Sequence, residues 1–169
     1  LYPWGPSARQ GLPSFTELHG LKGGAVCKAE IVRGIAKALK MDVLTPPAAT
    51  GDVDTDVRAK AEGALTLLEQ NDFVIAHFNG SDEAAHRYDY QAKADFISRI
   101  DEQFVQTIAA QYKEPLRVVI CGDHVTSSVT GKHSDGCTPV IAGYLNTSGQ
   151  HIELTSYRDI LNFLMKESD

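Results

Sequence analysis

The sequence contains few cysteines and no Cys-x-x-Cys motif. Cys27, Cys121 and Cys137 are widely spaced in a chain of 169 residues. An odd number of cysteines at such spacing argues against a disulfide framework and is typical of a reducing compartment. We therefore expect a cytoplasmic protein without a structural zinc site of the cysteine type.

Long apolar runs and an excess of positive charge are also absent. No stretch approaches the ~20 apolar residues of a membrane-spanning helix, and no basic–apolar–small leader opens the chain. Sixteen basic residues face 22 acidic ones, for a formal net charge of −6. This balance argues against a general nucleic-acid-binding surface. We expect neither a membrane nor a nucleic acid as partner.

Apolar residues make up 43% of the chain, which is enough for the core of one domain. Their spacing predicts strands that alternate with helices. Strands are predicted at 41–44, 72–78, 116–121 and 138–144, with a short apolar run at 25–27. Helices are predicted at 29–39, about 54–70, 90–112 and 156–165. Such alternation predicts an α/β fold, three layers (α/β/α) with a largely parallel central sheet.

Shorter segments give predictions about a loop, a helix cap and the burial of two cysteines. The segment 1–20, rich in Pro, Gly and Ser, is predicted to be loop. Asp54 or Thr55 is expected to cap the helix that follows it. Cys27 and Cys121 lie in apolar runs and are expected to be buried.

Two polar clusters follow the two clearest strands, where a parallel sheet gathers its chemistry. Asp82 and His86 are four residues apart, so a helical turn would place both on one face. Asp123 and His124 follow Gly122 at the end of the strand 116–121, and His133 comes nine residues later in a loop rich in Gly, Ser and Thr. Carboxylate and imidazole groups together suit Mn²⁺, Zn²⁺ or Mg²⁺. We therefore predict a divalent-metal site.

Basic residues offer candidates for a phosphate contact. Lys22 is flanked by glycines that let backbone N–H groups approach an anion, so we take it as the candidate substrate-binding residue. Arg33 and Arg58 could serve, but helix-surface salt bridges are expected for both. His77, in the strand before the first cluster, either supports a metal ligand or is simply buried. The Asp52–Asp56 segment is expected to cap and to be solvated rather than to bind calcium.

Taken in their order along the chain, several segments of the sequence resemble those of the alkaline-phosphatase-like metalloenzyme superfamily. They resemble above all its archaeal-type cofactor-independent phosphoglycerate mutases. The matching pieces cover about residues 10–145: Gly20-Leu21-Lys22-Gly23, Ala49-Thr50-Gly51…Asp54-Thr55, Asp72-Phe73-Val74…His77, Ser81–His86, Ile100-Asp101-Glu102 and Asp123-His124…His133. The chain departs from the family pattern at Ser81, where a proline is common, and at Val125-Thr126-Ser127, where Thr-Pro is common.

The resemblance implies two divalent ions, Mn or Zn before Mg. Asp82, His86 and His133 would hold the first ion, and Asp123 and His124 the second. In the family, an Asp and a nucleophilic Ser or Thr from an N-terminal segment complete the second site, and residues 1–169 contain no counterpart of that segment. We expect 1–169 to be a single metalloenzyme domain segment, the C-terminal part of a longer enzyme whose N-terminal part is its partner.

The activity implied is interconversion of 3-phosphoglycerate and 2-phosphoglycerate through a phosphoserine intermediate, on a small phosphorylated substrate. The chain alone is expected to be inactive. A phosphatase, a phosphonate hydrolase or a phosphopentomutase of the same superfamily is the alternative reading. A further alternative is a degenerate, non-catalytic domain that serves metal binding or interaction.

Overall fold

The computed structural model describes residues 11–147 and 154–165, and these form two compact units. We call residues 1–79 the amino-terminal unit and residues 80–169 the carboxyl-terminal unit. Each unit is described by itself. The predicted helices and strands are largely confirmed, with the differences given below.

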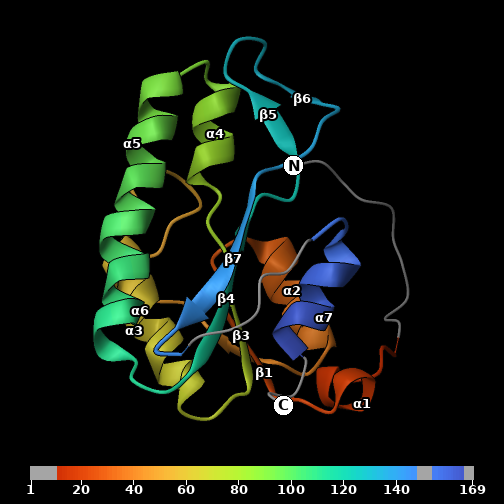
Figure 1. Cartoon of the computed structure of the whole chain (residues 1–169). Coiled ribbons are helices and arrows are strands. Elements are labelled where there is room, and N and C mark those ends of the chain that lie inside the picture. The colour runs from red at the N-terminus through yellow and green to blue at the C-terminus, as the bar shows by residue number, and fades with distance from the viewer. Residues whose placement is uncertain (1–10, 148–153, 166–169) are drawn as a thin grey trace. The chain divides into compact units, whose positions relative to one another are not determined.

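The amino-terminal unit is built on a parallel sheet with strand order β2-β1-β3, of which Figure 1 labels β1 and β3. Its elements are α1 (Phe15–His19), β1 (Gly23–Val26), α2 (Glu30–Ala38), β2 (Asp42–Leu44), α3 (Val57–Leu68) and β3 (Phe73–Ala76). All four residues of the central strand β1 are buried, which is typical of a strand covered on both faces. The predicted α/β class with a parallel sheet is therefore confirmed.

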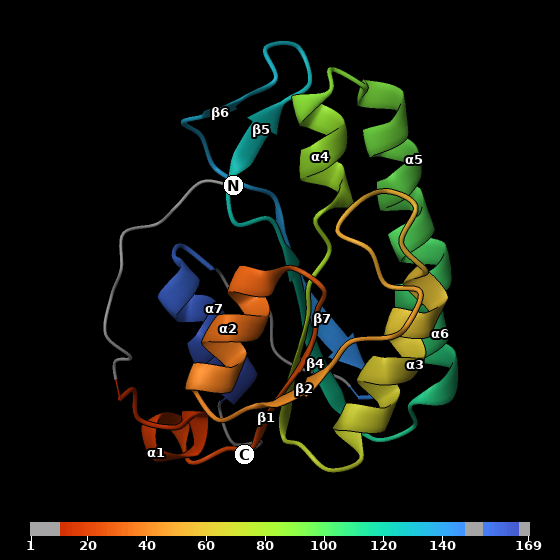
Figure 2. The ribbon, with the colours of Figure 1, turned by 180° about the vertical axis from the view of Figure 1, so that it is seen from behind.

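Alternate residues of β1 show how the two faces are covered. An added Cβ at Gly23 would lie 2.8 Å from Phe15 Cδ1, whereas one at Gly24 would lie 3.2 Å from Leu67 of α3. Ala25 packs with Ala36 of α2 in one apolar cluster. Helices α1 and α2 thus cover one face and α3 covers the other, so this unit has the three layers expected from the sequence (Figure 2).

The first helix was missed by the sequence analysis, which predicted loop over residues 1–20. Residues 1–10 lie outside the described residues, but Ser14 opens α1 with a complete capping box. The Glu17 backbone N–H donates to Ser14 Oγ, and the Glu17 carboxylate accepts from the Ser14 backbone N–H. The Ser-x-x-Glu pattern was visible in the sequence and is a known helix start.

The cap of α3 also differs from the prediction. Asp56, rather than Asp54 or Thr55, accepts a hydrogen bond from the Ala59 backbone N–H, 2.8 Å away. Asp54 instead accepts from the Thr50 hydroxyl. The expected capping role of this acidic segment is confirmed, with the cap one or two residues later than predicted.

The same unit buries a charged side chain. Lys60 of α3 is 1% exposed, and its ammonium donates to the His77 carbonyl at 3.0 Å and lies 4.7 Å from the centre of the Phe78 ring. Burial lowers the Lys60 pKa to about 8, and the neighbouring Cys27 partly opposes that shift. Cys27 is fully buried, as predicted, and burial raises its pKa.

The carboxyl-terminal unit pairs its strands in antiparallel fashion. Its strands are β4 (Leu116–Cys121), β5 (Val125–Ser127), β6 (Lys132–Ser134) and β7 (Val140–Leu145), paired as β4-β7 and β5-β6. Helix α7 (Tyr157–Met165) packs on β4, where Arg117 donates to the Phe163 carbonyl. Parallel pairing is therefore a feature of the amino-terminal unit. Cys121 is exposed, so its predicted burial was wrong: it ends β4 opposite exposed Val140.

Two helices stand side by side in this unit, α4 (Gly80–His86) and α5 (Tyr90–Ile100), in both views (Figures 1 and 2). The helix predicted over 90–112 continues from α5 through a π-helical turn (Asp101–Val105) into α6 (Gln106–Gln111). Asp89 caps α5 by accepting from the Ala92 backbone N–H. Helix α4 is the helical turn predicted for Asp82 and His86.

Candidate metal centre

Helix α4 carries the first two predicted ligands on one face. His86 Nε2 lies 3.3 Å from Asp82 Oδ2, as the four-residue spacing predicted. The other ring nitrogen, Nδ1, is 2.8 Å from the Gly131 carbonyl oxygen. Since a carbonyl can only accept, Nδ1 carries a proton, and in the neutral ring the lone pair is then on Nε2. The Gly131 carbonyl thus favours the neutral tautomer that binds a metal through Nε2.

The hairpin β5-β6 supplies the third ligand. His133 was predicted in a loop but lies in β6, opposite Thr126 of β5. Gly131, with a φ of +63°, makes the turn that the strands require. His133 Nε2 lies 3.8 Å from Asp82 Oδ1, and the His86 and His133 ring centres are 5.1 Å apart.

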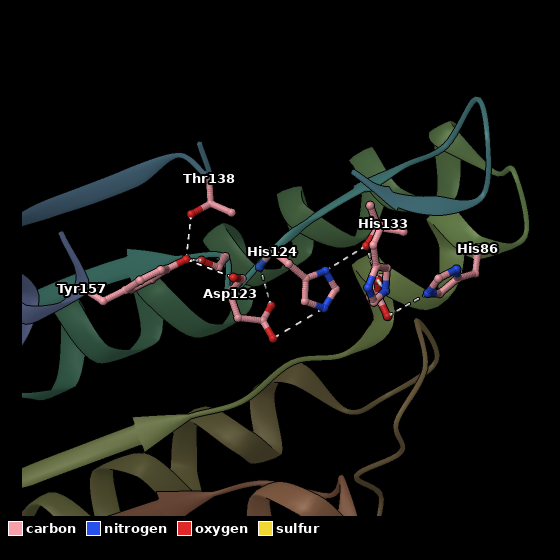
Figure 3. Close-up of polar contacts among 9 residues, drawn as sticks. His86, Asp123, His124, His133, Thr138 and Tyr157 are labelled. Carbon is pink, nitrogen blue, oxygen red and sulfur yellow. Dashed lines mark hydrogen bonds and ion pairs between the residues drawn. The ribbon is translucent and has the colours of Figure 1, made fainter. Parts of the chain in front are cut away.

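The segment between β4 and β5 brings the remaining pair to the same place. His124 and His133 have ring centres 4.0 Å apart, and His124 Nε2 lies 3.6 Å from Asp123 Oδ2 (Figure 3). The Asp123 side chain is 84% exposed, whereas that of Asp82 is 24% exposed. Asp82, His124 and His133 therefore come together within one unit, His86 adjoins Asp82, and Asp123 is joined to the group through His124.

These residues fit a divalent ion. Asp82, His124 and His133 each offer one ligand atom, and these atoms all lie within 4.8 Å of one another. A tetrahedral ion with bonds of about 2.1 Å holds its ligand atoms about 3.4 Å apart, so small side-chain movements would close this group around an ion. One carboxylate with imidazoles is a donor set for divalent metal ions.

Three residues that the sequence analysis did not assign hold these ligands in place. Thr126 bonds both Asp82 and His124, and Gly131 bonds His86. The Tyr157 hydroxyl lies 2.8 Å from the Gly122 carbonyl and 3.1 Å from that of Asp123. Figure 3 shows Tyr157 pointing toward Asp123. The sequence signal that could have found Thr126 was its place two residues after His124, which puts both side chains on the same side of an extended segment. Nothing in the sequence links Tyr157 to Asp123, because α7 is brought there by packing on β4.

Lys22, the predicted phosphate contact, does not lie at the carboxyl ends of the strands. Lys22 precedes β1, at the amino end of the parallel sheet, and its backbone N–H donates to Asp72 Oδ2 at 2.8 Å. The glycines after it, Gly23 and Gly24, are packed against Phe15 and Leu67. Their small size is explained by this packing rather than by an approaching anion. The binding role of Lys22 stays a prediction.

Arg58 and Arg33, the other candidates for a phosphate contact, differ in their hydrogen-bond and ion-pair partners. Arg58 forms the expected helix-surface ion pair with Glu62, at 3.5 Å. Arg33, in the first turn of α2, has a buried Nε without a hydrogen-bond partner among the described residues. His77 follows β3, where its N–H donates to Val26 and its carbonyl accepts from Lys60.

Comparison with known proteins agrees with this chemistry. A family described as Metalloenzyme superfamily matches residues 2–160. The chain belongs to the metalloenzyme superfamily. Among curated members, it is 37% identical over 137 residues to the 2,3-bisphosphoglycerate-independent phosphoglycerate mutase of Metallosphaera sedula, covering 81% of this chain and 33% of that protein. The mutase of Methanopyrus kandleri is 35% identical over 142 residues, covering 83% and 33%.

Two solved structures are also similar to this chain. A protein from Pyrococcus horikoshii is 35% identical with a TM-score of 0.72, over 77% of this chain and 39% of that one. A cofactor-independent phosphoglycerate mutase from Thermoplasma acidophilum is 28% identical with a TM-score of 0.52, over 66% and 27%. The resemblance seen in the sequence is confirmed, and the chain spans about a third of the length of the curated relatives it matches.

None of the helices in the described part of the chain combines the length and apolar composition that a membrane crossing requires.

Proposed function

We propose that this chain is the metal-binding part of a cofactor-independent phosphoglycerate mutase, which interconverts 3-phosphoglycerate and 2-phosphoglycerate. The observation that carries the proposal is the convergence of Asp82, His86, Asp123, His124 and His133 within the carboxyl-terminal unit. The mutases that the chain resembles supply the substrate class. The rest of such an enzyme is the partner that this chain requires.

The ligands divide between two ions in this proposal. Asp82, His86 and His133 hold the first, and Asp123 and His124 contribute to the second. The resemblance to the mutases supports this division, and the ligand atoms of His124 lie beside those of Asp82 and His133, as two neighbouring ions would require. Mn²⁺ or Zn²⁺ fits this donor set best, with Mg²⁺ less suited to imidazole.

Divalent ions at such a site neutralise charge on the phosphoryl oxygens and lower the pKa of a coordinated hydroxyl. The side chains of this chain do the positioning. Gly131 orients the His86 ring, Thr126 joins Asp82 to His124, and Tyr157 holds the backbone at Asp123. The nucleophilic Ser or Thr is proposed to lie outside these 169 residues, so the chain alone should show no mutase turnover.

Lys22 of the amino-terminal unit remains the proposed substrate contact. Arg33 in the same unit is a second candidate, because its buried Nε has no hydrogen-bond partner among the described residues. The described cysteines, Cys27, Cys121 and Cys137, are free thiols, which supports a cytoplasmic location.

The test is an assay of the complete protein that this gene encodes, with 3-phosphoglycerate as substrate and no 2,3-bisphosphoglycerate. After chelation, Mn²⁺, Zn²⁺ and Mg²⁺ are restored separately, and 2-phosphoglycerate and inorganic phosphate are both measured. A mutase forms 2-phosphoglycerate with little phosphate release. Rapid release of phosphate without 2-phosphoglycerate would instead indicate a phosphatase, and no turnover of phosphate esters would indicate a non-catalytic domain.

A further inference from the structure

Thr126 lies at the centre of the ligand cluster without being a ligand itself. It is 5% exposed, in β5. Its hydroxyl oxygen lies 2.5 Å from Asp82 Oδ1 and 3.1 Å from His124 Nδ1. One hydroxyl group thus joins a carboxylate from α4 to an imidazole from the segment after β4.

The protons in this arrangement can be assigned from donor and acceptor capacity. An ionised carboxylate only accepts, so the single Thr126 hydroxyl proton is donated to Asp82. The hydroxyl oxygen can then only accept from His124, which requires the proton of the neutral ring to be on Nδ1. In that neutral tautomer the lone pair of His124 is on Nε2, the ring nitrogen that lies 3.6 Å from Asp123 Oδ2.

Thr126 is itself held from two further directions. It stands opposite His133 in the β5-β6 pair, and its carbonyl accepts from the Lys93 ammonium at 2.8 Å. Its position is therefore fixed by the hairpin and by α5, independently of the two ligands that its hydroxyl contacts. A group that is fixed in this way can orient its neighbours rather than follow them.

We propose that Thr126 is a positioning residue of the metal centre: its hydroxyl sets the His124 tautomer with Nε2 as the metal-binding nitrogen and couples that ring to Asp82. This inference rests on the proposed metal site. It assigns to one hydroxyl the link between a ligand of the first ion and a ligand of the second. Loss of the hydroxyl should therefore disturb both ligands at once.

The competing explanation is that Thr126 is only a β-branched residue suited to a strand. Two variants separate the explanations. Thr126→Val keeps the branched shape and removes the hydroxyl, whereas Thr126→Ser keeps the hydroxyl and removes the methyl group. A matched control is Thr107→Val in α6, which alters another buried threonine of the same unit.

The first measurement is the tautomer of His124 in the metal-free 169-residue chain, read from ring ¹⁵N chemical shifts. The wild type is expected to show the Nδ1–H form, as are Thr126→Ser and Thr107→Val, whereas Thr126→Val should show a mixture. This measurement involves no metal, so it tests Thr126 even if the proposed function fails. A wild-type ring protonated on Nε2 would overturn the proposal without any variant.

The second measurement is calorimetric titration of the same chains with Mn²⁺ and Zn²⁺. Thr126→Val should weaken binding about 10- to 100-fold, the usual effect of losing a hydrogen bond behind a ligand. Thr126→Ser should stay within about 3-fold of the wild type. If Thr126→Val binds as the wild type does, or if folded Thr126→Ser binds as poorly as Thr126→Val, the positioning role is refuted. Failure of the wild type to bind either ion would instead count against the proposed metal site.

Discussion

The two units of this chain treat their polar side chains in opposite ways. In the amino-terminal unit, Lys60 is buried, and desolvation lowers its pKa to about 8. In the carboxyl-terminal unit, the candidate ligands are partly exposed, from 24% for Asp82 to 84% for Asp123, and are oriented by hydrogen bonds. Lys60 is enclosed at a cost to its charged form, whereas the candidate ligands stay accessible to an ion from solvent.

The two units also differ in the burial and the pairing of their strands. The central strand of the amino-terminal unit is buried along its whole length and its sheet is parallel. The paired strands of the other unit are antiparallel, and β6, which carries His133, is exposed throughout. The comparison predicts that substitutions in the carboxyl-terminal unit will change metal binding, whereas those at Lys60 will change stability and its dependence on pH.

The largest expected effect is on metal binding, from Asp82→Ala. Asp82 contacts His86, His133 and Thr126, so its loss removes a ligand and the carboxylate that three neighbours share. We expect at least a hundredfold loss of Mn²⁺ affinity, about 2.7 kcal/mol, by calorimetry. The control is Asp95→Asn, an exposed acidic residue on α5 of the same unit. An equal loss in that control, or an unchanged affinity in Asp82→Ala, would break the comparison.

A somewhat smaller effect is expected from Lys60→Met, and it depends on pH. The folded pKa of about 8 lies below the ordinary value of 10.5, so between these values the unfolded chain binds a proton that the folded chain does not. The wild type should therefore gain stability as the pH rises from about 8, since its cost of burying the charge is fully present only below that pH. Between pH 8 and 10 the wild type should gain about 2 kcal/mol relative to Lys60→Met.

Urea unfolding of both proteins across that pH range measures this difference. Lys37→Met, at an exposed lysine of α2, is the control and should give a curve parallel to that of the wild type. Parallel curves for the wild type and Lys60→Met would mean that Lys60 is not buried as a charge. Metal affinity should be the same in all three proteins.

The smallest effect is expected from Gly131→Ala. Gly131 has a φ of +63°, and an added Cβ would lie 2.8 Å from Tyr88 Cζ and 3.1 Å from the His86 carbonyl oxygen. The turn should shift and take with it the carbonyl that orients His86. We expect about a tenfold loss of Mn²⁺ affinity and a destabilisation of about 1 kcal/mol. Gly143→Ala in β7, where an added Cβ has open space, is the control. Equal affinities in the two variants would show that the Gly131 turn does not orient His86.

The sequence predicted the repeating strand–helix pattern well because apolar periodicity is a local property. It placed β4, α2 and α7 within about two residues, and it placed Asp82 and His86 on one helical face. Its failures at α1 and at β6 have physical causes. The capping box at Ser14 lies in a short helix with little apolar pattern. The strand β6 is three exposed residues that exist only by pairing with β5.

The sequence by itself determined which residue types could bind a divalent ion and the segments that carry them, because ligand chemistry and helical spacing are properties of the residues alone. Only the tertiary structure decided that His124 and His133 lie against Asp82, that Thr126 joins two of these ligands, and that Lys60 is enclosed. These contacts join residues far apart in the chain. They depend on strand pairing and on packing, which no local pattern specifies.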